Sequence, residues 1–494
     1  MDQNTAEAFS HLRKESLDIY NRLKSIEEDI QFIYQIHNAY LDYPLLPNLR
    51  CGAWYTDPSL AAPHPAYFKS TDGHFSNWSF NLRRANLHLL NLCSSSDGII
   101  LVDSTRSGKR MPDALSKTIP IWCAVVNRAM LLRYPETSRR DWDILLHTPP
   151  GVVSTQEHSQ IVPLLDGWAS ALNESSYALP NLSLPLRPAS ITSSTSLPPP
   201  IWITPASTSF PKFPSESRTF FPVVCVSASR QVQEGVDRRS GGFVYIQGSG
   251  DDHELWGMGL TPEIFWEHRK LIMSTGRSDM EAVVASCASR AHGTNKARRP
   301  SAIDRVNGRI LLCSTADIIA ELKGQLHQTF EIPAVVTFLV LSSHVKWNDA
   351  SMVANPRVQY ISAPEGKNGR TFVQTVLPRS MDFIQTQLIQ GRSICVACDT
   401  GKDLSVGVAL VALSRFFDEH GKFLESNTQN NTLGSYIWST SIFLTLTPQS
   451  DKRIIRTRLE WIIASRPQAN PTRSTLKRVN EFLLTPNSLF HRQT

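Results

Sequence analysis

Several segments of the chain carry residues whose types and spacing suit chemistry on a phosphate-bearing substrate. One is Ser393–Ser405, in which a short apolar run is followed by Cys-Asp-Thr-Gly-Lys-Asp-Leu-Ser and then by a second apolar run. This pattern predicts a strand, a tight loop and a helix. Gly401 lets backbone amides turn inward, the helix dipole favours an anion, and Lys402 adds a positive charge. The loop is therefore predicted to hold a phosphate; the alternative is a turn that binds no ligand.

The same loop resembles the catalytic loop of cysteine phosphatases, Cys-x5-Arg-Ser/Thr. Cys398, Gly401 and Ser405 stand at matching positions, but Leu404 occupies the arginine position. Without that guanidinium a transferring phosphoryl group loses its bidentate clamp. The resemblance implies a dual-specificity-phosphatase-like domain that keeps the anion site and has lost hydrolysis.

A second segment places a carboxylate at the end of a predicted strand. The apolar run Gly98–Val102 leads to Asp103, and the following residues bring hydroxyl groups, Gly108 and three cations, Arg106, Lys109 and Arg110. Such a loop suits a sugar phosphate with magnesium. It loosely resembles the phosphoribosyl-diphosphate loop of phosphoribosyltransferases, although the paired acid of that loop is missing. The alternative is a solvated basic loop.

In residues 69–90, charged and aromatic side chains alternate. Lys69, Arg83 and Arg84 could hold phosphates, and Asp72 or His74 could transfer a proton. The alternative is a structural role, with the leucines of the second half in a helix core.

Residues 247–256 place Asp251, Asp252 and His253 directly after two glycines. They could bind a hard cation, or one carboxylate could act as a base. The alternative here is an acidic turn before a capped helix.

Composition narrows the class of protein. The chain has 494 residues, with 50 Lys and Arg and 44 Asp and Glu, for a net charge of +6. Residues 69–140 hold 11 Lys and Arg against 5 acids, and residues 451–494 hold 9 against 3, which favours a polyanionic partner, although solvated faces give the same counts. We find no apolar run of membrane-spanning length, no signal peptide and no disulfide pattern among the eight cysteines. We therefore expect a soluble, cytoplasmic protein with no membrane partner.

The elements that must position these segments follow from periodicity. We predict an α/β fold in which a long amphipathic helix over 6–37 precedes an α/β or α+β domain, and a phosphatase-like α/β domain follows. The stretch 180–222 holds ten of the 31 prolines and is expected to be an irregular insert. Strands are predicted at 221–226, 242–247, 309–314, 335–341, 358–362 and 393–398, and helices at 119–132 (in its latter part), 257–290, 370–390, 406–420, 436–446 and 450–465. The predicted domains are 1–46, 47–290, a basic linker over 291–307, and 308–494.

Together these segments resemble the initiator tRNA phosphoribosyltransferase family. The resemblance lies in Lys69–His74, Trp78–Leu90, Gly98–Asn127, Gln247–Trp266 and Cys398–Ser405, and thus spans nearly the whole chain. It implies transfer of 5-phosphoribosyl from phosphoribosyl diphosphate to the ribose 2′-hydroxyl of adenosine 64 in the T-stem of initiator methionine tRNA. The added phosphate would exclude this tRNA from elongation.

We accordingly expect three groups of site residues, with Mg²⁺ as cofactor and no DNA partner. The catalytic candidates are Asp72, His74, Asp251, Asp252 and His253, with Asp251 and Asp252 also as tentative metal ligands. The donor-phosphate candidates are Asp103, Arg106, Lys109, Arg110, Cys398, Asp399, Thr400, Gly401, Lys402, Asp403 and Ser405. The tRNA-binding candidates are Lys69, Arg83, Arg84, Arg298 and Arg299. Two alternatives stay open: a cysteine-dependent phosphatase acting on phospho-RNA or phosphoprotein, and a non-catalytic tRNA-binding protein.

Overall fold

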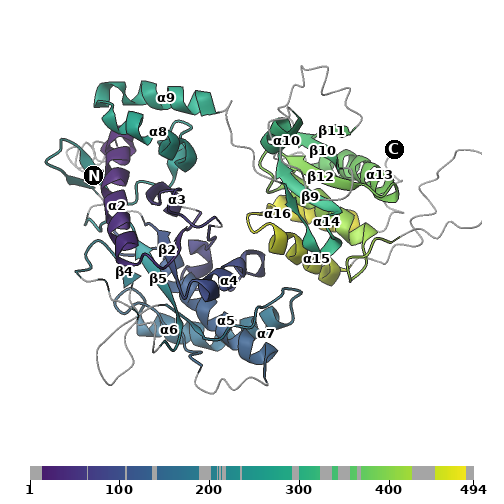
Figure 1. Cartoon of the computed structure of the whole chain (residues 1–494), viewed down its shortest axis with the longest axis horizontal. Coiled ribbons are helices and arrows are strands. Elements are labelled where there is room, and N and C mark those ends of the chain that lie inside the picture. Colours follow the sequence, from purple (N-terminus) through teal and green to yellow (C-terminus); the bar gives the residue numbers. More distant parts are fainter. Residues whose placement is uncertain are drawn as a thin grey trace, which may run out of the picture. The chain divides into compact units, whose positions relative to one another are not determined.

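The computed structural model divides the chain into two compact units, residues 1–294 and 295–494, which are described separately (Figure 1). The structure describes residues 14–485 apart from 50, 64, 106–107, 136–141, 189–201, 209, 211–212, 214–217, 234–235, 292–299, 323–335, 343–356, 364–368 and 425–450. Among the described residues, no helix is both long and apolar enough to span a membrane.

A parallel sheet forms the centre of the N-terminal unit, with strand order β1-β2-β5-β3 and β4 also paired to β5. Its strands are β1 (Leu45–Pro47), β2 (Ile99–Asp103), β3 (Leu186–Pro188), β4 (Trp202–Ile203) and β5 (Phe221–Ser227). Every residue of β2 and β5 is buried, which explains their unbroken apolar sequence. A separate antiparallel hairpin joins β6 (Val236–Arg238) to β7 (Val244–Ile246).

The isoleucine stripe of helix α2 (Ile19–Ala39) is buried in the same apolar core as side chains of β2 and β5. Residues 14–17 are also helical, and Asp18 separates them from α2, which it caps: the amide of Asn21 donates to Asp18 Oδ1 at 2.8 Å. Residues 6–13 of the predicted helix lie outside the described residues. The helical region predicted over 257–290 is confirmed, and it consists of two helices, α8 and α9, that are separated near Gly276. The other helices of this unit are α3 (Gly52–Tyr55), η1 (Ser70–Gly73), η2 (Leu82–Arg84), α4 (His88–Ser95), the π-turn η3 (Ala114–Thr118), α5 (Ile119–Arg133), α6 (Thr155–Ile161), η4 (Val162–Leu164), α7 (Leu165–Asn173), η5 (His253–Leu255), α8 (Pro262–Ser274), η6 (Arg277–Asp279) and α9 (Met280–Ala291).

The proline-rich stretch is less irregular than its composition suggests. Strands β3 and β4 lie inside it and both pair with β5, each over only two or three residues. Such short pairings are compatible with proline because few backbone amides must donate to a neighbouring strand. Residues 189–201 of this stretch lie outside the described residues.

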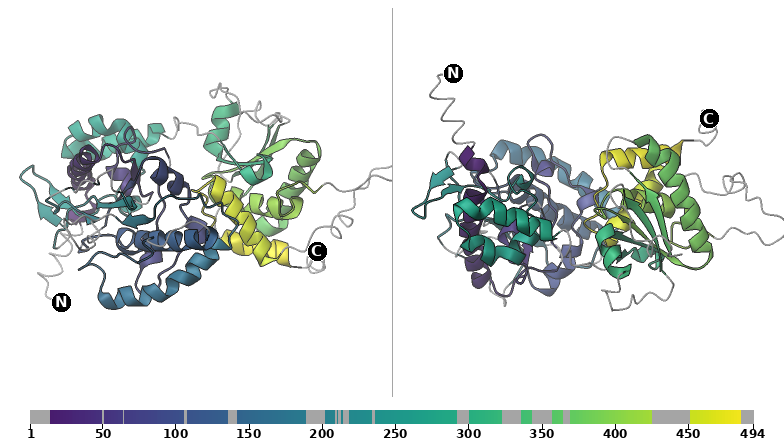
Figure 2. Two further views of the ribbon diagram at one scale, coloured as in Figure 1. Left: turned by 60° about the horizontal axis from the view of Figure 1, so that its bottom comes forward. Right: turned by 90° about the horizontal axis from the view of Figure 1, so that it is seen from above.

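The C-terminal unit holds a second sheet of order β11-β10-β12-β9-β8, parallel except for the short pairing of β8 with β9 (Figure 2). The strands are β8 (Ser301–Ala302), β9 (Ile310–Ser314), β10 (Val336–Ser342), β11 (Val358–Ser362) and β12 (Ser393–Cys398). The last four lie close to their predicted positions, whereas β8 falls in the predicted basic linker and was not predicted. The helices are η7 (Asp304–Val306), α10 (Thr315–Leu322), α12 (Gly369–Thr371), the π-turn η8 (Phe372–Val376), α13 (Leu377–Ile389), α14 (Leu404–Phe416), α15 (Lys452–Ser465) and α16 (Arg473–Leu484). Helix α14 is buried almost throughout. Helix α16 was not predicted, and the helix predicted over 436–446 lies outside the described residues.

Candidate active site

The carboxyl ends of the parallel strands in the N-terminal unit bring polar side chains together. Asp103, the last residue of β2, is buried; its Oδ2 accepts a hydrogen bond from Asn48 Nδ2 and its Oδ1 accepts one from the Ser104 amide, at 2.8 and 2.9 Å. Asn48 follows β1, so the contact joins two adjacent strand ends. In open α/β sheets this edge is where ligands bind.

A buried polar network that the sequence analysis missed lies at the same edge. Ser104 Oγ lies 2.6 Å from Ser229 Oγ, and Ser229 Oγ donates to Asp29 Oδ2 at 2.7 Å. Tyr245 donates to the other oxygen of Asp29 at 2.8 Å. Burial raises the pKa of Asp29 well above its usual value, although the hydrogen bonds from Ser229 and Tyr245 act in the opposite direction. The network spans more than 200 residues of sequence, and no local pattern marks it.

Tyr55 connects this network to the predicted Asp251 segment. Its hydroxyl accepts a hydrogen bond from the Gly250 amide at 2.8 Å and lies 3.4 Å from Ser229 Oγ. Asp251 itself is buried, and its Oδ1 accepts hydrogen bonds from Cys51 Sγ and from the Asp252 amide.

The neighbours of Asp251 show how this segment is held. The Trp256 indole donates to the Asp251 carbonyl, and the His253 ring meets Trp54 edge-on at a centroid distance of 5.5 Å. Asp252 is exposed, in the left-handed region with φ 48°. Among the described residues, no group of three or more His, Cys, Asp or Glu side chains forms a metal centre.

The loop after β2 leads into a cluster of alternating charges. Asp113 lies 2.8 Å from Lys109 Nζ, 3.0 Å from Lys117 Nζ and 3.7 Å from His74 Nε2. Burial would raise the pKa of Asp113, but the hydrogen bonds from Lys109 and Lys117 outweigh it and lower the pKa. The carboxylate is therefore ionised at neutral pH beside a half-exposed imidazole.

Lys117 extends the cluster into the core. Its Nζ also lies 2.9 Å from Glu157 Oε1, and the Trp78 indole donates to the same oxygen at 3.0 Å. Lys117 and Glu157 are both buried. Neither was predicted as a site residue, because each is unremarkable within its own segment.

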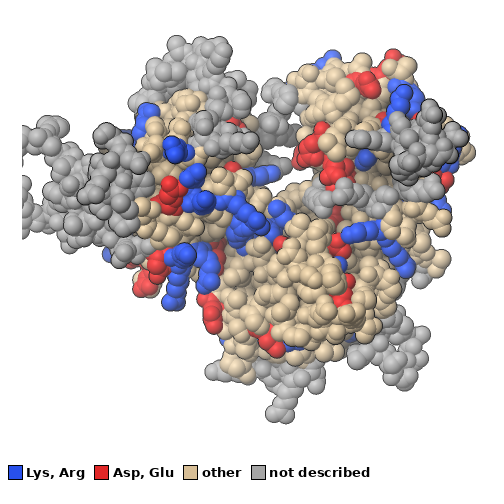
Figure 3. Space-filling view, turned by 180° about the vertical axis from the view of Figure 1, so that it is seen from behind, with Lys and Arg blue, Asp and Glu red and all other residues tan. Residues whose placement is uncertain are grey.

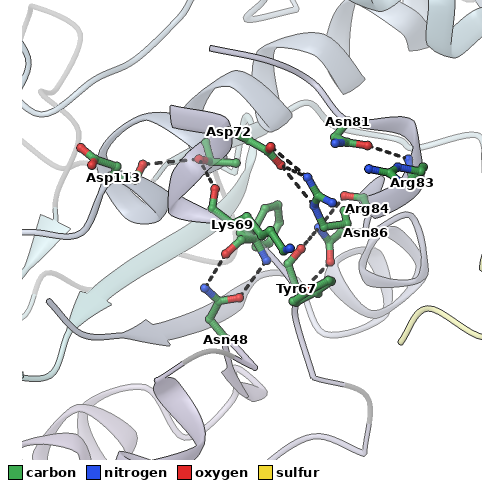
Figure 4. A network of polar contacts seen from close by, with 11 residues as sticks. Asn48, Tyr67, Lys69, Asp72, Asn81, Arg83, Arg84, Asn86 and Asp113 are labelled. Carbon is green, nitrogen blue, oxygen red and sulfur yellow. Dashed lines mark hydrogen bonds and ion pairs between the residues drawn. The ribbon is translucent and has the colours of Figure 1, made fainter. Parts of the chain in front are cut away.

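Asp72 is held by an arginine. Arg84 Nη2 donates to both carboxylate oxygens of Asp72, at 2.8 and 2.9 Å, and Arg84 Nε donates to Oδ2 (Figure 4). The Asp72 turn also packs closely on η3, where a Cβ on Gly73 would lie 2.8 Å from Thr118 Oγ1. The predicted catalytic residue Asp72 and the predicted phosphate ligand Arg84 are therefore paired with each other.

The other predicted residues of this segment surround the ion pair. Figure 4 shows Lys69 and Arg83 in the same polar network; Lys69 Nζ lies over the Tyr67 ring at 5.8 Å, and the Arg83 amide donates to Asn81 Oδ1. The structure also connects the loop after β2 to the Asp251 segment, since Gln247 Nε2 donates to the Lys109 carbonyl at 2.6 Å. Three segments distant in sequence therefore meet at one edge of the sheet.

The predicted phosphate loop of the C-terminal unit is largely closed on itself. Gly401 has φ 64°, and its amide donates to the Cys398 carbonyl at 3.0 Å, while the Lys402 amide donates to Thr400 Oγ1 at 3.2 Å. These two amides thus already have acceptors within the loop. Cys398 Sγ and Ser405 Oγ, the first and last residues of the loop, lie 3.1 Å apart.

An arginine from outside the loop secures it. Arg466, which follows α15, donates from Nε to the Gly401 carbonyl at 2.9 Å and from Nη1 to the Leu312 carbonyl and to Ser301 Oγ. Its guanidinium is buried and engaged with protein acceptors. It therefore tethers the loop to β8 and β9.

Carboxylates occupy positions around the same loop. Asp399 Oδ1 accepts a hydrogen bond from Thr315 Oγ1 at 3.4 Å, whereas its buried Oδ2 has no partner among the described residues. Asp403 Oδ1 accepts a hydrogen bond from the Thr472 amide. With two acids and one lysine, the loop is less positively charged than the phosphatase loop, which has an additional arginine. It is therefore less favourable to phosphate.

Comparison with known proteins decides the family. A model described as the Rit1 N-terminal domain matches residues 12–289, and one described as the Rit1 DUSP-like domain matches residues 357–483. The chain belongs to the Rit1 family. The C-terminal unit is accordingly a dual-specificity-phosphatase-like α/β domain, as predicted.

Two relatives extend along almost the whole chain. The tRNA A64-2′-O-ribosylphosphate transferase of Saccharomyces cerevisiae is 31% identical, with 98% of this chain and 96% of the relative covered. An uncharacterized protein of Schizosaccharomyces pombe is 32% identical, with 95% of each chain covered. Among solved structures, human DUSP28 covers 38% of this chain and 93% of its own length, with 14% identity and a TM-score of 0.24.

The remaining predicted site residues are cations proposed to bind phosphate or tRNA, and their roles stay predictions. Arg106, Arg298 and Arg299 lie outside the described residues. Lys109 and Arg110 are exposed on the loop after β2, as a role in phosphate binding requires.

Proposed function

We propose that this Rit1-family protein transfers 5-phosphoribosyl from phosphoribosyl diphosphate to the 2′-hydroxyl of adenosine 64 in initiator methionine tRNA. The similarity to the yeast transferase over nearly the full length of both chains carries this proposal. The enzyme is a pentosyltransferase that acts in the cytoplasm and excludes its product tRNA from elongation.

The reaction is a substitution at the anomeric carbon of the donor. The bond from this carbon to diphosphate breaks, a bond to the 2′-oxygen forms, diphosphate leaves, and the hydroxyl proton passes to a base. We assign the base to His74. Its side chain is 49% exposed, and Asp113 lies 3.7 Å from Nε2, where it can orient the ring and stabilise the imidazolium.

The edge of the N-terminal sheet is the proposed donor site. Asp103 ends β2, and the exposed Lys109 and Arg110 of the next loop can hold phosphate oxygens. Mg²⁺ enters this proposal together with the donor's diphosphate, because it is commonly held by substrate phosphates and one or two carboxylates. No step of the reaction is assigned to a metal held by protein ligands alone.

Transfer RNA contacts are proposed to involve both units. Stem RNA is read mainly through its backbone and shape, so exposed cations suffice for much of the affinity. Viewed from behind, Lys and Arg side chains gather on the C-terminal unit (Figure 3). Helices α15 and α16 of this unit carry five exposed cations: Lys452, Arg453, Arg456, Arg473 and Lys477.

A labelling experiment tests this function. The protein is incubated with initiator tRNA and phosphoribosyl diphosphate that carries ³²P in its 5-phosphate. We expect label in the tRNA, an equal amount of free diphosphate, and no label in a control tRNA with 2′-O-methyladenosine at position 64. Absence of label in the unmodified tRNA would overturn the proposal and favour a tRNA-binding protein without activity.

A further inference from the structure

We propose that Phe75 and Trp78 form a stacking platform for an unpaired nucleobase of the RNA substrate. This inference rests on the proposed function. It adds a binding site for a base to a reaction centre otherwise described only by its sugar and phosphate contacts.

Phe75 is a large apolar residue that is largely exposed to water. Its side chain is 64% exposed, and its ring meets the half-buried Trp78 edge-on, with centroids 5.5 Å apart and planes at 78°. Large apolar side chains that stay in water in a defined arrangement mark interaction sites. Because the two rings are nearly perpendicular, the flat, sequence-tolerant face on which a base can stack is that of the more exposed ring, Phe75, with Trp78 packed beside it.

Hydrogen bonds to Glu157 and within the loop hold the platform in place. The Trp78 indole donates to Glu157 Oε1 at 3.0 Å, and the buried Lys117 fixes that carboxylate from 2.9 Å. The loop itself is closed by two backbone bonds, from the Asn77 amide to the His74 carbonyl and from the Ser79 amide to the Asp72 carbonyl. An anchored aromatic pair loses little conformational entropy when a base stacks on it.

Charge indicates RNA as the occupant. Phe75 follows His74 directly, and His74 faces the Asp113 cluster, which includes Lys109 with 58% of its side chain exposed. An aromatic surface beside cations suits a base attached to a phosphate backbone. Bases within a stem hide their faces, so the bound base comes from an unpaired part of the tRNA.

Phe75→Ala tests the platform, with Leu132→Ala as control, because Leu132 is a similarly exposed apolar side chain (50%) in the same unit. Dissociation constants for initiator tRNA are measured by fluorescence anisotropy, and KM is measured for each substrate. We expect Phe75→Ala to weaken tRNA binding and raise the KM for tRNA by about 10-fold. The KM for phosphoribosyl diphosphate and the melting temperature should stay unchanged, and Phe75→Trp should restore affinity.

Two results would overturn the platform. One is wild-type tRNA affinity in Phe75→Ala, and the other is an equal loss in Leu132→Ala. The binding measurement does not need turnover. If the wild-type protein transfers no label, the proposed function fails, whereas the platform is still judged by the affinity difference.

Discussion

In each unit of this protein, a central parallel strand leads into a polar loop with an aspartate at or after the end of the strand. The two loops differ in the residues that surround them. In the N-terminal unit, β2 ends at Asp103, and the loop that follows leads to exposed cations, the His74–Asp113 pair and the Phe75–Trp78 pair. In the C-terminal unit, β12 ends at Cys398, and Gly401, Arg466 and Thr472 tie the following loop to its own unit.

The difference shows that a strand–loop–helix motif does not by itself make a binding site. Amides that already have acceptors and a guanidinium bound to carbonyls are not available to a ligand without rearrangement. The contacts therefore favour the N-terminal unit for the chemistry and a structural or RNA-binding role for the phosphatase-like unit.

The largest expected effect comes from His74. We expect His74→Ala to lower kcat about 10²–10⁴-fold with little change in the KM for tRNA, because it removes the proposed base. The measurement is single-turnover transfer of ³²P-labelled phosphoribosyl. The matched substitution in the other unit, Cys398→Ser, should leave kcat within about two-fold of the wild-type value. The opposite ranking of the two variants would reverse the comparison.

The next effect concerns stability. Lys117→Met should destabilise the N-terminal unit by about 3–5 kcal/mol, since it leaves the carboxylates of Asp113 and Glu157 without their shared cation. Hydrogen exchange of β2 and β5 in the full chain measures the loss. Lys477→Met, at an exposed position on α16, serves as the control and should cost about 0.5 kcal/mol or less. Equal protection in both variants would show that the cluster carries no stability.

A smaller effect should appear as a dependence on pH. Burial raises the pKa of Asp29, so its contribution to stability is fully present below the unfolded-state pKa and is lost as pH rises through the folded-state pKa. Between these two pKa values, the decrease in the free energy of unfolding approaches about 1.4 kcal/mol per pH unit. Asp29→Asn mimics the protonated carboxyl and should flatten this slope. Exchange protection of β5, measured from pH 5 to 9, checks it, and an unchanged slope would contradict the assignment.

The smallest effect tests the phosphatase alternative. Leu404→Arg restores the arginine of the phosphatase pattern, yet we expect no phosphomonoester hydrolysis above background, because Asp399 and the Arg466 tether remain. The assay uses a chromogenic phosphomonoester, with Cys398→Ser in the same background as control. Robust hydrolysis that depends on Cys398, in either the wild type or Leu404→Arg, would instead support the alternative.

The sequence by itself determined the local elements of the site. Continuous apolar runs located β2 and β12 to within a residue, and the polar residues after them located both loops, because buried parallel strands leave this pattern along the chain. The family followed from the same motifs. The sequence also showed that Leu404 replaces the phosphatase arginine.

Only the tertiary structure decided which of these residues are engaged with one another. Arg84 donates to both carboxylate oxygens of Asp72, a predicted catalytic residue, and Arg466 holds a loop 65 residues away. The Asp29–Ser229 contact joins residues 200 positions apart. Hydrogen bonds and ion pairs depend on distances of about 3 Å in space, and the spacing of residues along a chain does not specify those distances between remote segments.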